Sequence, residues 1–432
     1  MIDNVGLRCR LPGFHRPLCL RVTAVSAPSA PSALDTVMTP QERRSSASLA
    51  LIFALRMLGL FLVLPVFALE ARKYPGGDDA ALVGMAMGIY GLTQGILQIP
   101  FGVASDKFGR KPVMVVGLLI FAAGSAIAAW APSLHWLVAG RALQGAGAIS
   151  AAVTALLADQ TRDVVRTKAM ALVGASIGLM FALSLVLSPL LASFIGLHGL
   201  FAMTSALAVG GIAVVIWWVP PEPEKQVDQA RGGVLSVLRH PALLRLDFGV
   251  FVLHAVQLSM WVALPAMLVQ AGLARDQHWQ VYLPAVLASF FVMGATLFPL
   301  EKKGYLRAVF LSAIALIALV QLALWALVHT VAGVWPMALV LFVFFCGFNV
   351  LEASQPSLAS RVAPAASRGA ALGVYNTLQS LGFFAGGAFG GWLVKSAGAQ
   401  ALFLVSTLAM LAWLGVAWGM DAPASKTGLK AG

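Results

Sequence analysis

Long apolar stretches alternate with short polar ones along the whole chain. A helix that crosses the hydrocarbon core of a bilayer needs about 20 mostly apolar residues. The stretches are too long and too apolar for strands, and within a bilayer only helices or closed barrels satisfy every backbone group. The pattern therefore predicts an all-α integral membrane protein with twelve transmembrane helices, at residues 49–69, 81–101, 112–131, 134–158, 169–193, 198–219, 243–269, 280–300, 308–329, 334–358, 372–394 and 399–420.

The longest interruption, residues 220–242, is rich in proline and charge and separates six spans from six. We interpret it as a cytoplasmic linker between two six-helix bundles, residues 49–219 and 243–420. Residues 1–48 and 421–432 are expected to be cytoplasmic tails, the first of them disordered. No apolar run before residue 38 is long enough for a signal peptide; an organelle-type presequence or a start at Met38 are the alternatives for that segment.

Short matches relate the two halves at a nearly constant offset. Leu64-Pro65 recurs as Leu264-Pro265, at an offset of 200 residues. Arg166 recurs as Arg368, and Leu200-Phe201 recurs as Leu402-Phe403, both at an offset of 202. Parallel six-helix repeats are typical of secondary transporters, in which the substrate site lies near the midplane between the repeats.

Composition and charge exclude a soluble protein. The chain of 432 residues is 59% hydrophobic and 11% charged, against about 45–50% and about 25% in soluble domains. The net charge of +12 would suggest a nucleic-acid partner in a soluble protein, but here the basic residues lie in loops. Of the 29 Lys and Arg, 23 fall on the tails and on the loops after even-numbered spans, and 4 on the opposite side. This bias predicts cytoplasmic termini and, for a bacterial protein, the inner membrane.

Cysteine spacing gives no metal or disulfide pattern. Cys9 and Cys19 lie in the tail and Cys346 lies in an apolar run. The spans contain no His-rich cluster, nucleophile elbow or paired carboxylates at catalytic spacing, which argues against an integral-membrane enzyme. We expect no metal and no cofactor.

The loop after the second span carries the most specific motif. Its sequence from Gly102 to Lys111 resembles the loop signature of the major facilitator superfamily, Gly-x-x-x-Asp-Arg/Lys-x-Gly-Arg-Arg/Lys, in its expected place. The resemblance implies a conformational latch for the outward-facing state, in which Asp106 caps the helix that starts near Gly369 and Arg110 bridges Asp106 and Asp159. The expected latch residues are Gly102, Asp106, Lys107, Gly109, Arg110, Lys111 and Asp159.

A second motif, Arg141-Ala142-Leu143-Gln144-Gly145-Ala146-Gly147, resembles the Arg-x-x-Gln-Gly-x-Gly pattern of proton-coupled members. Together with Met38-Thr39-Pro40, Glu42-Arg43-Arg44 and Arg56-Met57-Leu58-Gly59, it makes residues 38–420 resemble bacterial drug/proton antiporters of the YajR type. Such proteins can carry a further soluble domain after the last helix; only a short segment follows here, so we expect no regulation by one. The fifth span reads Ser188-Pro189-Leu190-Leu191-Ala192-Ser193 where many drug antiporters have Gly-Pro-x-x-Gly-Gly, which leaves the transport direction open.

Four ionisable residues lie well inside the spans: Arg56, Arg141, His254 and Glu352. They fall on spans one, four, seven and ten, which line the central cavity in the superfamily that the chain resembles. A charge inside the membrane costs at least about 2.5–3.5 kcal/mol and is functional by default. The alternatives are structural pairing for Arg141 and a polar core position for His254.

Of these four, His254 and Glu352 are the favoured proton carriers. Arginine stays protonated, whereas imidazole titrates near about pH 6.5. Asp247 is set aside because it lies near the cytoplasmic end of its span.

Aromatic and amide side chains on the same spans predict a pocket for an amphipathic organic ligand. We expect about half of this set to contact substrate, the others packing between helices. The set is Gln144, Gln257, Trp261, Phe348, Asn349, Tyr375 and Gln379.

Two functions remain open. The first is proton-driven export of small lipophilic compounds by a monomer. The second is import or uniport of a small metabolite such as a sugar or an amino acid, which a cavity richer in Asn, Gln and charges would favour.

Overall fold

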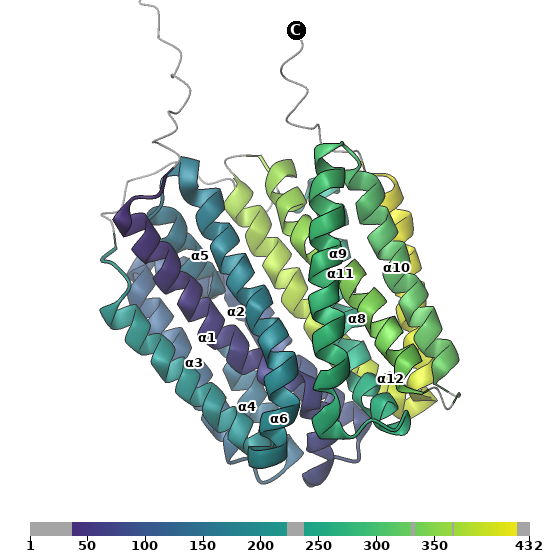
Figure 1. The fold of residues 1–432 in the computed structure, drawn as a ribbon. Helices are drawn as coiled ribbons and strands as arrows, with labels where there is room; N and C mark the ends of the chain where they lie inside the picture. Colours follow the sequence, from purple (N-terminus) through teal and green to yellow (C-terminus); the bar gives the residue numbers. More distant parts are fainter. Residues whose placement is uncertain (1–36, 223–236, 329, 331–332, 365–366, 421–432) are drawn as a thin grey trace, which may run out of the picture.

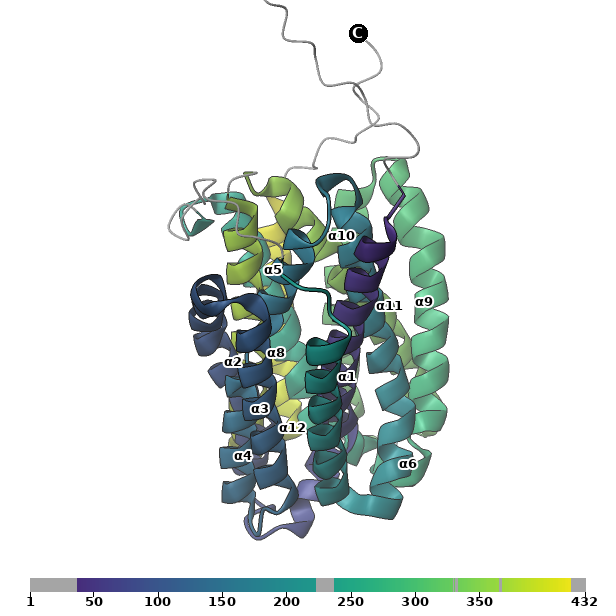
Figure 2. The ribbon, with the colours of Figure 1, turned by 90° about the vertical axis from the view of Figure 1, so that its left-hand side faces the viewer.

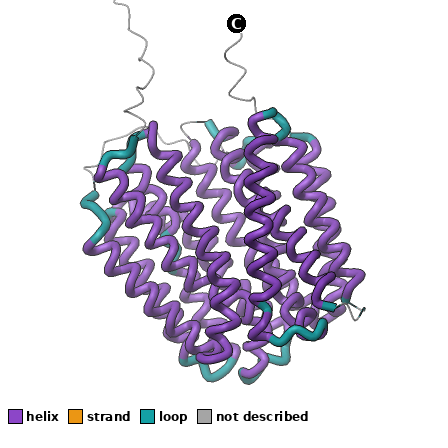
Figure 3. Tube along the Cα trace, in the orientation of Figure 1, coloured by secondary structure: helices purple, strands orange, loops and turns teal. Residues whose placement is uncertain are grey.

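The computed structural model describes residues 37–222, 237–328, 330, 333–364 and 367–420. Within these ranges it is helical throughout and contains no strand (Figure 3). The elements are α1 Pro40–Glu70, η1 Ala71–Lys73, α2 Ala80–Phe108, α3 Arg110–Ala129, α4 Leu134–Ala146, α5 Ser150–Asp159, α6 Asp163–Trp217, α8 Pro241–Gln270, η2 Arg275–Gln277, α9 Trp279–Lys302, α10 Leu306–Leu327, α11 Val334–Val362 and α12 Arg368–Trp418.

Ten helical segments of the described residues are long and apolar enough to cross a membrane. Two of them are 50 residues long, about 75 Å at 1.5 Å per residue, which is more than twice the thickness of a hydrocarbon core. Each of these two contains one glycine with positive φ, Gly196 at +63° and Gly398 at +80°. Counted as two crossings each, they are consistent with the predicted twelve, and the all-α membrane fold is confirmed.

The two kinks also fit the internal repeat. Gly196 and Gly398 are 202 residues apart, the same offset that relates the sixth and twelfth spans. A positive φ is accessible to glycine without the steric penalty that a Cβ would bring. Pro65 and Pro265, which lie inside α1 and α8, are related by an offset of 200.

Some boundaries differ from those predicted. The fourth span, predicted as continuous, is broken between α4 and α5 at residues 147–149. There Gly147 leaves the helical conformation and packs on α3, where an added Cβ would lie 2.4 Å from the Gly117 carbonyl oxygen. Residues 40–48, predicted as part of a disordered tail, form the first turns of α1. Thr39 and Glu42 cap that helix reciprocally, and Pro40 occupies its first position.

The helices form two groups side by side, α1–α6 and α8–α12 (Figures 1 and 2). The ends of α1 and α12 nearest the chain termini lie at the same end of the bundle. We call it the terminal face; it also carries the loops after α2, α5, α9 and α11, and it is the face predicted to be cytoplasmic. The opposite end is called the distal face.

Helices α2 and α12 form the closest contact between the two groups. A Cβ added at Gly84 of α2 would lie 2.2 Å from the Gly387 carbonyl oxygen of α12. A Cβ added at Gly391 of α12 would lie 2.4 Å from the Ala80 carbonyl oxygen of α2. Small residues therefore let the two backbones touch, as is common where helices pack in membranes.

Two ion pairs join the groups at the distal face. The buried carboxylate of Glu70, at the end of α1, binds Arg275 of η2. Asp79, at the start of α2, lies 2.7 Å from the Lys395 ammonium of α12.

The outer surface of the bundle is apolar. Trp335, Phe194 and Phe291 are each at least 79% exposed, which suits contact with lipid tails and would be unfavourable in water. Apart from those inside the spans, such as Arg56, Arg141 and Glu352, the charged side chains of the described residues lie near the two faces.

Candidate functional site

The loop between α2 and α3 turns on Gly109, whose φ of +99° favours glycine. Gly102, the other glycine of the motif, has more room. An added Cβ there would lie 3.5 Å from Ala151 Cβ, an ordinary contact. The backbone conformation thus explains the second glycine of the motif, and packing does not explain the first.

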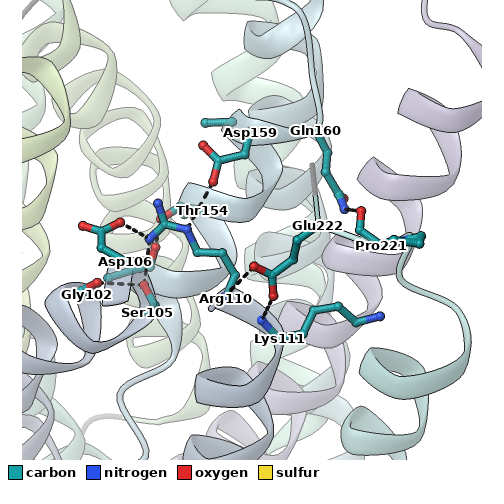
Figure 4. Close-up of polar contacts among 12 residues, drawn as sticks. Gly102, Ser105, Asp106, Arg110, Lys111, Thr154, Asp159, Gln160, Pro221 and Glu222 are labelled. Atoms are coloured by element: carbon teal, nitrogen blue, oxygen red, sulfur yellow. Dashed lines mark hydrogen bonds and ion pairs between the residues drawn. The ribbon is translucent and has the colours of Figure 1, made fainter. Parts of the chain in front are cut away.

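The buried side chain of Arg110 is the centre of a polar cluster at the terminal face (Figure 4), in which the two carboxylates are about 40% exposed. Its guanidinium lies 2.6 Å from Asp106 Oδ1 and 3.1 Å from Asp159 Oδ2. It also donates a hydrogen bond of 2.7 Å to Ser105 Oγ. The cluster therefore ties the loop after α2 to the end of α5. The expected cap of the helix after Gly369 by Asp106 stays a prediction.

Glu222 adds a second connection that the sequence analysis did not identify. Its carboxylate accepts hydrogen bonds from the backbone N–H groups of Arg110, at 2.9 Å, and Lys111, at 2.6 Å (Figure 4). It thereby caps α3, whose first residues have no cap from their own N-cap glycine. Lys111 Nζ donates to the Val219 carbonyl oxygen at 2.9 Å. The start of the predicted linker is thus attached to the latch loop.

Lys107 belongs to the same loop but points elsewhere. Its side chain is exposed, and its ammonium group lies 5.4 Å from the centroid of the Phe108 ring.

The C-terminal half holds a titratable pair inside its spans. His254 of α8 is buried, and its Nε2 lies 3.2 Å from Glu352 Oε2 of α11. Gln379 of α12 lies between them, with its Nε2 at 2.8 Å from His254 Nε2 and 3.4 Å from Glu352 Oε1. The Glu352 side chain is 40% exposed, whereas that of His254 is 2% exposed.

The hydrogen bonds of His254 show which ring nitrogen carries a hydrogen and which one can gain a hydrogen. Nδ1 lies 2.9 Å from the Val250 carbonyl oxygen, which can only accept, so Nδ1 carries a hydrogen. In the neutral ring, Nε2 is then an acceptor for the Gln379 amide, and Glu352 Oε2 has no hydrogen-bond partner among the described residues. Protonation adds a hydrogen at Nε2, which can be donated to that oxygen. Nε2 therefore has an acceptor on α11 and a donor on α12 within hydrogen-bonding distance.

The two arginines lie in the N-terminal half, away from this pair. Arg56 donates to Ser150 Oγ at 3.0 Å and to the Tyr90 hydroxyl at 2.8 Å. Arg141 donates to Gln144 Oε1 at 2.6 Å and to backbone carbonyls of α2. Both side chains are at most 4% exposed. These contacts join α1 to α2 and α5, and α4 to α2, which agrees with the alternative of structural pairing for Arg141.

The two halves differ in their chemistry at these spans. Ser150 and Glu352 are related by the offset of 202, but the offset of 200 relates Arg56 to Val256, two residues from His254. The Arg56–Ser150 and His254–Glu352 contacts therefore join the same pairs of spans through different faces of the first and seventh. The sequence analysis named Arg56 but missed Ser150 and Tyr90, because a hydroxyl in an apolar span gives no signal by itself.

Six of the seven residues predicted to contact substrate are buried, and Gln379 is partly exposed. Gln144 is fully buried between Arg141 and Ser125. Asn349 donates to Ser289 Oγ at 2.8 Å. Substrate contact for the set stays a prediction. The buried members are Gln144, Gln257, Trp261, Phe348, Asn349 and Tyr375.

Comparison with known proteins covers nearly the whole chain. The model of the Major Facilitator Superfamily matches residues 49–387 and 299–432. The chain is 44% identical to the inner membrane transport protein YajR of Escherichia coli (strain K12), over 90% of this chain and 86% of that protein. It is 24% identical to the multidrug resistance protein MdtH of Yersinia enterocolitica, over 84% and 91%.

Solved structures agree on the fold. The human organic anion transporter MFSD10 matches with a TM-score of 0.65 and 19% identity, over 88% of this chain and all of that one. Fold, loop motif and relatives lead to the same assignment. The chain belongs to the major facilitator superfamily and is a multi-pass membrane transporter.

Proposed function

We propose that this transporter exports small lipophilic or amphipathic compounds in exchange for protons, by alternating access. One relative is named as a multidrug resistance protein. The observation that carries the proposal is the His254–Glu352 pair, a histidine and a carboxylate inside the spans at 3.2 Å from one another. Titratable groups within a membrane mark proton pathways in transporters.

The pair supplies a physical route from protonation to helix contacts. A proton on His254 Nε2 favours a bond to Glu352 on α11, and its loss favours the bond to Gln379 on α12. A substrate that donates a hydrogen bond to Glu352 competes with the protonated ring for the same carboxylate. Proton and substrate then bind in alternation, which is what an antiporter requires.

The cluster around Arg110 is proposed to be the latch that holds the terminal face closed. It contains two carboxylates, one arginine and the capping carboxylate of Glu222. Charges of this kind can bias states that differ by a few kcal/mol without fixing one of them permanently.

We further propose a monomer in the inner membrane with both termini and the linker in the cytoplasm. The charge bias supports this orientation. A reporter active only in the cytoplasm should be active when fused after Lys225 and silent after Gly76. The opposite result would reverse the orientation.

Dye efflux tests the function. Cells that lack their own exporters would be loaded with ethidium and with a neutral amphipathic dye, with and without a protonophore. We expect the protein to lower the dye content, the protonophore to abolish the effect, and Glu352→Gln to behave like an empty vector. Dye movement that the protonophore does not change would indicate a uniporter. Unchanged dye content together with uptake of sugars or amino acids would indicate an importer.

A further inference from the structure

A second polar layer lies beside the His254–Glu352 pair and takes one residue from each of the same three helices. It consists of Asp247 on α8, Tyr375 on α12 and Gln355 on α11, all at most 3% exposed. The Tyr375 hydroxyl donates to Gln355 Oε1 at 3.3 Å. The sequence analysis set Asp247 aside as a residue near the end of its span, but the structure buries its side chain.

Helix positions place this layer nearer the terminal face. Asp247 lies six residues from the start of α8, Tyr375 seven from the start of α12, and Gln355 seven from the end of α11. All three are therefore about 9–10 Å from the helix ends at that face. His254, Gln379 and Glu352 lie thirteen, eleven and ten residues in, about 15–20 Å deep.

The spacing aligns the layers on the helix faces. Asp247 and His254 are seven residues apart, Tyr375 and Gln379 four, and Gln355 and Glu352 three. Residues at these separations share one side of a helix. The two layers therefore lie one above the other on the same faces of α8, α11 and α12.

The outer layer has unused hydrogen-bonding capacity. Asp247 Oδ2 and Gln355 Nε2 are buried and have no hydrogen-bond partner among the described residues. No ion pair of Asp247 with a Lys or Arg is found among the described residues. The titratable group nearest to it on another helix is Tyr375 of α12, which interacts electrostatically with both Asp247 and Glu352. His254 lies two turns further along α8. A buried carboxylate kept for stability would be paired, so a different role is needed.

We propose that Asp247 carries protons between the terminal face and the His254–Glu352 pair, by way of the Tyr375 hydroxyl. A protonated Asp247 gives its carboxyl proton toward the inner layer as Glu352 gains one, and Asp247 is reprotonated from the terminal side. Tyr375 accepts one proton as it donates another and is unchanged. This inference rests on the proposed proton coupling at His254 and Glu352.

Infrared spectroscopy tests the proposal without a known substrate. The protein would be reconstituted with the terminal face outward, sorted by access to a C-terminal tag, and difference spectra recorded between acidic and neutral buffer. We expect the carbonyl bands of two protonated carboxyl groups beyond those of the exposed carboxylates. One should be lost in Asp247→Asn and the other in Glu352→Gln. Asp78→Asn, which removes an exposed carboxylate, is the matched control.

A pH jump on the terminal side gives the rate. Asp247→Asn should slow the appearance of the Glu352 band by about a hundredfold, the size of effect expected when a positioned proton carrier is lost. Tyr375→Phe should slow it less, and Asp247→Glu should stay within about threefold of the unaltered protein, which also shows that the site folds. An unchanged spectrum and rate in Asp247→Asn would overturn the relay. An unchanged spectrum in Glu352→Gln would overturn the proposed coupling instead.

Discussion

The His254 ring has one nitrogen with a fixed partner and one with two partners within reach. Nδ1 donates to the Val250 carbonyl oxygen, whereas Nε2 lies 2.8 Å from Gln379 Nε2 on α12 and 3.2 Å from Glu352 Oε2 on α11. The motif search located His254 and Glu352 by their scarcity inside the spans. It did not reveal their pairing, because residues on spans seven and ten come together only through the fold.

Glu352→Gln keeps the shape of the side chain and removes its titration. We expect it to abolish substrate flux driven by a pH gradient in proteoliposomes while substrate binding and passive exchange persist. His254→Gln should reduce coupling to the same extent if the ring shares the proton, and less if it only forms hydrogen bonds. Full gradient-driven flux in the double variant would contradict the coupling role.

The residues around Arg110 should be needed for transport and dispensable for folding. Asp106→Asn and Arg110→Ala should each reduce transport severely while the protein still inserts and folds. Glu222→Gln, which weakens one helix cap by about 0.3–1 kcal/mol, should have a smaller effect. Substrate flux and the melting temperature would be measured, and the melting temperature should stay close to that of the unaltered protein. Lys303→Ala, in an exposed loop, is the control. If the first two variants transport normally, the cluster is a solvated turn.

Glu222 shows why part of this cluster could not be read from the sequence. Glu222 and Arg110 are 112 residues apart, and a carboxylate among prolines looks like any other linker charge. Only the positions of α3 and α6 bring it to the open N–H groups of Arg110 and Lys111.

Among the elements, hydropathy predicted the number and order of the spans well because length and apolarity determine what can cross a bilayer. It did not predict the break between α4 and α5. There Gly147 is forced out of the helix by close packing on α3, a tertiary effect that an apolar run does not record.

The contact between α2 and α12 gives a prediction at this scale. Gly84→Ala places a methyl group where the Gly387 carbonyl oxygen lies, and it should destabilise the protein by about 1–3 kcal/mol as an overpacked site does. Gly174→Ala, in α6, meets no atom within 4 Å and should be neutral or slightly stabilising. Thermal unfolding in detergent distinguishes them. Equal melting temperatures would mean that the two helices separate more easily than their packing indicates.

For the whole molecule, the two halves touch along α2 and α12 and are joined at the distal face by Glu70–Arg275 and Asp79–Lys395. The sequence predicted two repeats. It could not predict these pairs, because each links residues that lie more than 200 positions apart.

Reversing one charge of the exposed pair should open the distal face. Lys395→Glu places two carboxylates together, and adding Asp79→Lys should restore the pair. Spin labels at Asp78→Cys and Ser396→Cys, with Cys9, Cys19 and Cys346 replaced, would report the separation. A longer distance in the single variant that shortens again in the double variant is expected. If the label distance is the same in the single and the double variant, the distal face is held closed by the glycine contacts between α2 and α12 alone.

The same pair should respond to acid. The Lys395 ammonium lowers the pKa of the Asp79 carboxyl below its usual value. A lowered pKa means that the stabilisation is complete above about pH 3.9 and is lost as the pH falls through the lowered value. The label distance should therefore be constant near neutrality and lengthen only in strong acid.

The kink at Gly196 has a consequence for how the chain enters the membrane. The spans on either side of it are joined without a separate loop, and residues 169–221 contain no Asp, Glu, Lys or Arg. Nothing in this stretch anchors one span in place while the next is synthesised. We therefore expect the insertion machinery to release the two spans into the lipid together, as a hairpin, so that biogenesis of this half proceeds in pairs of helices.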